Sequence, residues 1–151
     1  MLKIDELQDF GEAFKQENEA IKKVLFLVDE DDYSKFVKSE LNEDDQANLI
    51  IVLPSANIDF KDKDNFQFVN YLHFFIVKKI SDRGGYQKYF DSFVFTQPLI
   101  LQLFDFIKNK TGDFQECTFK DFDLGSTSID PVTEFARTYG FSLSIPLKTK
   151  P

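Results

Sequence analysis

Four acidic residues in a row are the first side chains of this sequence that could do chemistry. Asp29, Glu30, Asp31 and Asp32 directly follow the apolar run VLFLV, which predicts a short strand. Carboxylates gathered at the end of a strand can hold a magnesium ion. The same acids suit the first turn of a helix, because negative side chains are stabilised at the positive end of the helix dipole. We favour the helix start, and a metal or phosphoryl site stays open as the alternative.

The segment KKVLFLVDEDD resembles the opening strand of a phospho-receiver domain, in which paired acids bind a metal beside a phosphorylatable aspartate. That resemblance implies a second strand that ends in aspartate and a later strand that ends in lysine. The next apolar run, Asn48–Leu53, is instead followed by Pro54 and Ser55. The strand predicted at Phe66–Lys79 alternates, as an antiparallel strand does, and is too long for a buried parallel one. The likeness therefore stops at the first strand.

The single histidine and the single cysteine have no obvious partners. His73 has no second histidine and no cysteine at the spacing of a zinc site, and no serine or aspartate at a spacing known for a catalytic triad. We expect it to be a half-exposed or hydrogen-bonded residue of a sheet. Cys117 reads as a small buried apolar residue. One cysteine cannot form an internal disulfide, which favours a reducing compartment.

Phosphate and acyl-transfer motifs are missing from the sequence. Gly84 and Gly85 are not followed by the lysine of a phosphate-binding loop, and neither a G-x-G-x-x-G nor a G-x-S-x-G pattern occurs. Arg83 and Arg137 are the only arginines in the sequence. Arginine is the residue best suited to bind phosphate through bidentate hydrogen bonds. We therefore expect no enzyme activity, no catalytic residues, no bound cofactor and no resident metal.

The charge of the chain limits its partners further. The formal net charge is −8 and the pI is about 4.6. An acidic surface repels both the phosphate backbone of nucleic acids and anionic membranes. The apolar runs Leu49–Leu53 and Leu72–Val77 are far shorter than the roughly 20 residues that span a bilayer, and the first residues do not resemble a secretory signal. We expect a soluble protein, cytoplasmic when synthesised, with no membrane partner and no specific nucleic-acid partner.

The length of 151 residues suits a single domain over 1–151. The hydrophobic pattern predicts the α+β class, with a mostly antiparallel sheet packed against a long helix and helices near the N-terminus. The predicted helices cover residues 5–22, 29–41 and 86–110, and the predicted strands cover 24–28, 48–53, 66–79, 113–124 and 141–147. The segment 129–137 is either a strand or a single turn.

Three prolines and a charged segment carry specific expectations. Pro54 ends its strand, and the polar residues 54–65 then form an exposed loop between paired strands. Pro98 either kinks the long helix or divides it into two, the second capped by Thr96. Pro146 suggests that the last strand lies at an edge of the sheet.

The surplus of phenylalanine points to an apolar contact surface. The chain has 19 Phe and no Trp, and aromatic side chains dominate both cores and interfaces. In the strand 66–79, Phe66, Phe68, Leu72, Phe74 and Ile76 share one face. The reverse face carries apolar residues too. It is either covered by the N-terminal helices or exposed as a protein-binding patch. The interface candidates are Val69, Tyr71, Phe75 and Val77 of this reverse face, together with Phe60 and Phe141.

The layout of the whole chain resembles the tail-terminator or tail-completion proteins of phage tails and contractile injection particles. The resemblance is carried by an amphipathic helix at Ile4–Phe14, a long strand after an exposed loop at Asp64–Lys79, a long helix at Tyr86–Lys110 and the closing segment SIDPVTEFARTYGFSLSIPL. It implies a structural subunit that forms a ring with copies of itself, ends the tail tube or joins it to the neck, and becomes part of a virion or a phage-tail-like particle. Its partners would be tube, sheath or neck proteins. The alternative is a protein-binding adaptor module without a ring.

Overall fold

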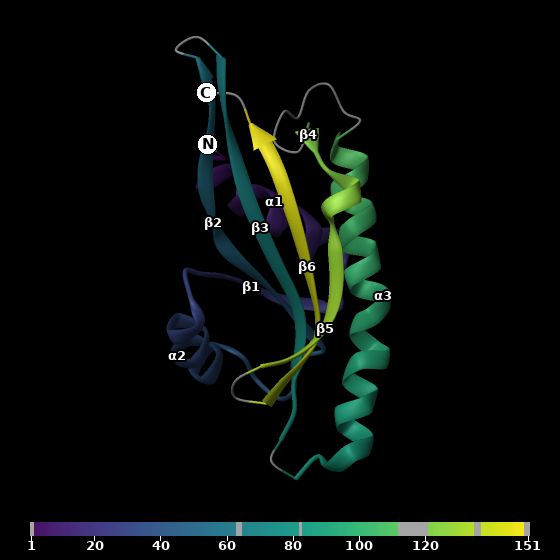
Figure 1. Ribbon diagram of the computed structural model, residues 1–151. Coiled ribbons are helices and arrows are strands. Elements are labelled where there is room, and N and C mark those ends of the chain that lie inside the picture. The colour runs from purple at the N-terminus through teal and green to yellow at the C-terminus, as the bar shows by residue number, and fades with distance from the viewer. Residues whose placement is uncertain (1, 63–64, 82, 112–120, 135–136, 150–151) are drawn as a thin grey trace.

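The computed structural model describes residues 2–62, 65–81, 83–111, 121–134 and 137–149. In chain order the elements are α1 (Ile4–Glu17), β1 (Ile21–Leu27), α2 (Glu30–Glu40), β2 (Ala47–Asp62), β3 (Asn65–Lys79), α3 (Gly85–Thr111), β4 (Asp121–Phe122), the 3₁₀ turn η2 (Leu124–Ser126), β5 (Ser128–Glu134) and β6 (Thr138–Thr149). The strands form one sheet in the order β1-β2-β3-β6-β4, with β5 also paired to β6. Only β1 and β2 run parallel; the other pairs are antiparallel. The predicted α+β class is confirmed, including the long helix that runs beside the sheet (Figure 1).

The main core lies between one face of the sheet and two helices. Leu72, Phe74 and Ile76 alternate along β3 and are fully buried, as the period of two predicts. The helices bring Leu7, Phe10 and Phe14 from α1 and Ile100, Leu103 and Ile107 from α3 to the same core. Burying a side chain of this size stabilises the fold by about 1.5–3 kcal/mol. The predicted apolar face of β3 is therefore the face that α1 and α3 cover.

Asn70 interrupts that apolar face, and its hydrogen bonds explain why it can be buried there. Its side-chain oxygen accepts from the backbone N–H of Leu2 at 3.1 Å. Its side-chain nitrogen donates to the Leu147 carbonyl at 3.2 Å and to the Thr149 hydroxyl at 3.0 Å. The residue thus fastens the start of the chain and the end of β6 to the middle of β3.

The opposite face of the sheet carries a smaller core under α2. Tyr33, Val37 and Leu41 pack there against Ile50 and Val77. The Tyr33 hydroxyl and the Thr138 hydroxyl lie 2.7 Å apart in a buried hydrogen bond that ties α2 to β6. One N-terminal helix thus covers part of the reverse face.

The prediction of a helix over residues 5–22 is wrong at its C-terminal end. Helix α1 stops at Glu17, and Ile21 already belongs to β1, where it pairs with Ala47. Ile21 keeps the helical spacing of apolar residues, but a strand that starts there buries the same side chain against β2. Gly11, which weakens a helix, has a packing reason: a Cβ at this position would lie 2.9 Å from Val24 Cγ1.

The exposed loop predicted over 54–65 is wrong. Strand β2 continues to Asp62 and pairs with β3 along this length, from Ser55 opposite Tyr71 to Phe60 opposite Phe66. Pro54 does not end the strand because it lies in a register shift between Val52 and Ser55, beyond the last residue of β2 that pairs with β1. The segment is the outer half of a long β-hairpin.

The prediction of a sheet edge at Pro146 is also wrong, since β6 lies between β3 on one side and β4 and β5 on the other. The Pro146 carbonyl accepts from the Asp123 N–H, beyond the residues that pair with β4 and β5. In an antiparallel strand the N–H and C=O of one residue point to the same side. The position of the N–H that Pro146 lacks therefore faces the gap between β4 and β5.

The remaining predictions lie partly within the described residues and partly outside them. The ambiguous segment 129–137 is a strand over Ser128–Glu134. Of the strand predicted at 113–124, only β4 lies within the described residues, and Cys117 lies outside them.

Helix α3 continues through Pro98 as one element, so the two-helix alternative is wrong. The Thr96 hydroxyl donates back to the Ser92 carbonyl at 2.7 Å and caps nothing.

Candidate interaction surface

The acidic residues after β1 act as the start of a helix. Asp29 is the N-cap of α2, and its carboxylate accepts from the Asp32 N–H at 3.0 Å. The Asp32 carboxylate in turn accepts from the Val28 N–H at 3.3 Å. Among the described residues no group of three or more His, Cys, Asp or Glu side chains could hold a metal ion. These carboxylates are used by backbone N–H groups, which confirms the helix-start interpretation.

His73 is hydrogen-bonded on the sheet, as expected. Its Nδ1 lies 2.9 Å from the hydroxyl of Ser144, the residue opposite it on β6. The pair lies on the exposed reverse face, next to Tyr71 and Ser142 along the two strands. Within the described part of the chain, no carboxylate is hydrogen-bonded to this pair, so the third member of a triad is not in place.

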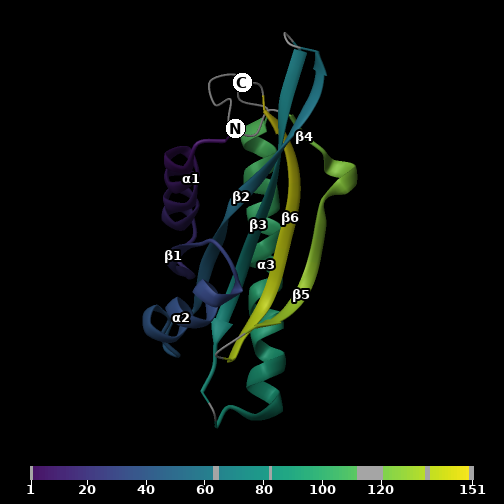
Figure 2. The ribbon, with the colours of Figure 1, turned by 60° about the vertical axis from the view of Figure 1, so that its left-hand side comes forward.

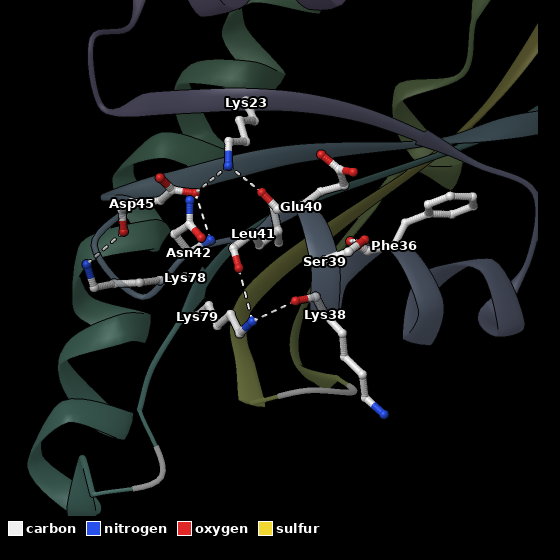
Figure 3. A network of polar contacts seen from close by, with 10 residues as sticks. All are labelled: Lys23, Phe36, Lys38, Ser39, Glu40, Leu41, Asn42, Asp45, Lys78 and Lys79. Atoms are coloured by element: carbon white, nitrogen blue, oxygen red, sulfur yellow. Dashed lines mark hydrogen bonds and ion pairs between the residues drawn. The ribbon is translucent and has the colours of Figure 1, made fainter.

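A network of lysines holds the loop between α2 and β2 (Figure 3). Lys23 donates to the Glu40 carbonyl and lies 3.6 Å from the buried Asp45 carboxylate. Lys79 donates to the carbonyls of Lys38 and Leu41 at 3.4 and 3.0 Å, and Lys78 donates to those of Asp45 and Gln46 at 3.2 and 3.3 Å. These donors satisfy carbonyl groups at and after the C-terminus of α2, where backbone partners run out.

Two open depressions of about 380 and 390 Å³ lie beside this network. Both are lined by Glu43, Asp44 and Lys79, with Lys38 in one and Lys88 and Asp91 in the other. Their charges are mixed, and Lys79 is already bound to backbone carbonyls. The arrangement fixes the loop between α2 and β2.

The predicted interface residues fall into two groups. Val77 is fully buried under α2, Phe75 packs against the same cluster, and Phe141 packs on the main core and on Phe93. Val77 was wrong as an interface residue, because α2 covers it. Phe75 and Phe141 are half-buried on opposite faces of the sheet, Phe75 beside α2 and Phe141 beside Phe93 of α3. Val69 is half-buried, and Tyr71 is 40% exposed.

Phe60, the last of the predicted interface residues, lies on a feature that the sequence did not predict. Beyond the pairing of Phe68 with Thr149, no further strand of the described residues lies beside the β2–β3 hairpin, which projects past the end of β6 (Figures 1 and 2). We call residues 57–68 the arm. Because β-strand side chains alternate, Ile58, Phe60, Phe66 and Phe68 share one face of it, which we call the arm face.

The arm face is apolar and largely open. Ile58 and Phe60 are 62% and 63% exposed, and the rings of Phe66 and Phe68 lie 5.9 Å apart. The reverse side of the arm is polar, with a hydrogen bond of 2.8 Å from Gln67 to the Asp59 carboxylate. A two-stranded ribbon with one apolar side is only marginally stable alone, so this side is suited to be covered.

A second exposed apolar surface runs along the outside of α3. We call Tyr86, Phe90, Val94 and Leu101 the α3 stripe; all four are exposed, Tyr86 by 74%. Their spacing puts them on one side of the helix, turned away from Ile100 and Leu103 in the core. Tyr86 and Phe90 stack with ring centroids 6.3 Å apart. In the sequence, the signal for this surface is a helix with apolar residues on nearly every side.

Of the helices within the described ranges, none has the length and apolar character needed to cross a membrane. Comparison of this chain with protein-family models, with curated protein sequences and with solved structures found no match.

Proposed function

We propose that this protein is a structural subunit that assembles with copies of itself into a ring, as part of a phage tail or a phage-tail-like contractile injection particle. The single observation that carries the proposal is the arm, a hairpin that leaves the body of the sheet and exposes Ile58 and Phe60. Isolated proteins rarely hold a projecting apolar element without a partner for it.

The chemistry of the remaining surface supports an assembly role. The carboxylates of Asp29 and Asp32 are bound to backbone N–H groups, and His73 is bound to Ser144. The lysine network around Asp45 holds a loop. Apart from separate exposed side chains such as Val28 and Leu124, the described surface groups its exposed apolar residues on the arm and the α3 stripe. In a ring that ends a tail tube, the net charge of −8 would keep DNA from adhering as it passes.

The test is to purify the chain alone and together with the proteins encoded beside it, and to examine both samples by light scattering and electron microscopy. The proposal expects rings of uniform diameter, either from the chain alone or on the ends of tubes. A strict monomer that binds none of the neighbouring proteins would refute it. A complex with a single partner and no ring would favour the adaptor alternative instead.

A further inference from the structure

The two exposed apolar surfaces of this chain lie at opposite ends of the molecule. Strand β3 begins in the arm and ends at Lys79, and α3 starts directly after it. Fifteen residues of strand cover about 50 Å. The start of α3 is therefore a full sheet length away from the arm, as Figures 1 and 2 show. An arm cannot reach the Tyr86 end of the stripe on its own molecule.

We propose that the arm face of one copy packs on the Tyr86–Phe90 end of the α3 stripe of a second copy. This inference rests on the proposed function and names the two surfaces that join its subunits. Donor and acceptor are different patches of the same chain, so the contact is head-to-tail. A head-to-tail contact repeats from copy to copy, and it closes into a ring when the rotation allows.

The areas of the two surfaces suit each other. The proposed contact joins Ile58 and Phe60 of the arm face to Tyr86 and Phe90 of the stripe, side chains that are 62%, 63%, 74% and 47% exposed. At about 200 Å² per side chain, each pair offers roughly 250 Å² of exposed surface. A standard specific interface buries about 1,600 Å², of which about 900 Å² is apolar. The two pairs supply somewhat more than half of that apolar area, and the half-buried Phe66 and Phe68 add to it.

The charges of the two surfaces do not oppose the contact. Residues 57–68 carry three Asp and two Lys, so the net charge of the arm is −1. The exposed Arg83 and Lys88 lie close to Tyr86 in the sequence, and Asp91 follows Phe90. The first turn of α3 contains no acidic residue, so the positive end of its dipole is not neutralised there. In a chain of net charge −8, this end of α3 is a place that the arm can approach with little repulsion.

The acceptor is also preorganised. Tyr86 stacks on Phe90 and contacts Tyr89 at 5.9 Å, and Tyr89 packs edge-on against Tyr139 of β6 at 5.0 Å. These rings are held by one another and by the sheet before a partner arrives. Rigid aromatic clusters lose little conformational entropy on binding and are typical interaction hot spots.

Cysteine cross-linking between separately purified variants tests the contact. In a Cys117→Ser background, Phe60→Cys and Phe90→Cys are prepared as two proteins, and Gln8→Cys, exposed on α1, serves as the matched control. Each variant is first checked by circular dichroism. In oxidised glutathione, the Phe60→Cys and Phe90→Cys mixture should form a disulfide-linked dimer at least about tenfold faster than the Phe60→Cys and Gln8→Cys mixture. Adding Arg83→Glu to the Phe90→Cys protein should slow the reaction.

Each other outcome overturns the inference in a distinguishable way. Equal rates with Phe90→Cys and Gln8→Cys would show random collision. Faster linking of Phe60→Cys to itself would show that arms meet arms. Oligomers seen by light scattering without a Phe60–Phe90 link would leave the proposed function standing and remove this acceptor. A monomer without any link would remove this contact, and the test with the neighbouring proteins would then decide the proposed function.

Discussion

Among the described glycines, Gly140, which lies opposite Val77, has the least room for a side chain. A Cβ on Gly140 would lie 2.0 Å from the carbonyl oxygen of Ile76, and that atom belongs to a central strand that cannot move aside. We predict that Gly140→Ala lowers the free energy of unfolding by at least about 2 kcal/mol. Urea denaturation followed by circular dichroism measures this. Gly125→Ala, in the exposed η2 turn, is the control, and equal losses in both variants would contradict the packing argument.

Asp123 is a residue whose charge the fold favours. Its carboxylate accepts hydrogen bonds from the Ser126 hydroxyl at 2.7 Å and from the Gly125 N–H at 2.9 Å. These hydrogen bonds, that of Ser126 first, lower the pKa of Asp123 below its ordinary value of 3.8. A lowered pKa in the folded state means that the contribution to stability is present above the unfolded pKa and is lost as the pH falls through the folded one.

The prediction for Asp123 is therefore a pH-dependent difference from Asp123→Asn. The free energies of unfolding of the two proteins should differ most near neutral pH and converge as the pH falls below 3.8 and through the lowered pKa of Asp123. Denaturation curves at several pH values measure the difference, and NMR titration of the carboxyl group gives the pKa directly. A difference independent of pH, or a pKa at or above the ordinary value, would contradict the assignment.

At the scale of elements, α2 is attached to the reverse face by few contacts, and Tyr33 makes the most specific one. Its hydroxyl lies 2.7 Å from that of Thr138 in a buried site. We predict that Tyr33→Phe costs about 1 kcal/mol of stability, since the buried hydrogen bond between the Tyr33 and Thr138 hydroxyls is lost while the ring packing against Phe75 remains. Thermal denaturation compared with Phe36→Leu, on the exposed side of α2, measures this. A larger loss in the control would contradict it.

The strands that sequence reasoning found are those with unbroken alternation. Strand β3 was predicted to within one residue because Leu72, Phe74 and Ile76 alternate strictly and are all buried. The arm half of β2 was read as a loop, because Asp59, Lys61 and Asp62 dominate its composition. Its apolar residues Ala56, Ile58 and Phe60 keep the period of two, but Ala56 is only half-buried and the other two are exposed, so composition and pattern disagree there.

The candidate surfaces were predictable in part. Phe60 was named from the sequence, but it lies on a paired arm and not in a loop. The sequence alone could not predict that Val77 and Phe75 pack under α2. This packing is a tertiary contact with no local signal. The α3 stripe had a local signal in the spacing of Tyr86, Phe90 and Val94. The spacing alone does not say which side of an apolar helix faces the core, so the exposure of these residues was not predicted.

At the scale of the whole molecule, the chain is strongly acidic and carries two exposed apolar surfaces, the arm and the α3 stripe. Copies of net charge −8 repel one another over long distances. Association must therefore come from short-range apolar burial, and added salt should strengthen it by screening the repulsion. This behaviour is opposite to that of an assembly held by surface ion pairs, which salt weakens.

Sedimentation velocity of the wild-type chain, Phe60→Asp and Asn57→Asp over a wide concentration range tests the central claim most directly. Both variants add one carboxylate to the same strand of the arm, Phe60→Asp on the apolar face and Asn57→Asp on the polar face. The account predicts that the wild type and Asn57→Asp associate alike, and that Phe60→Asp stays monomeric at concentrations at least about tenfold higher, with unchanged thermal stability. Association of Phe60→Asp equal to that of the wild type would contradict it.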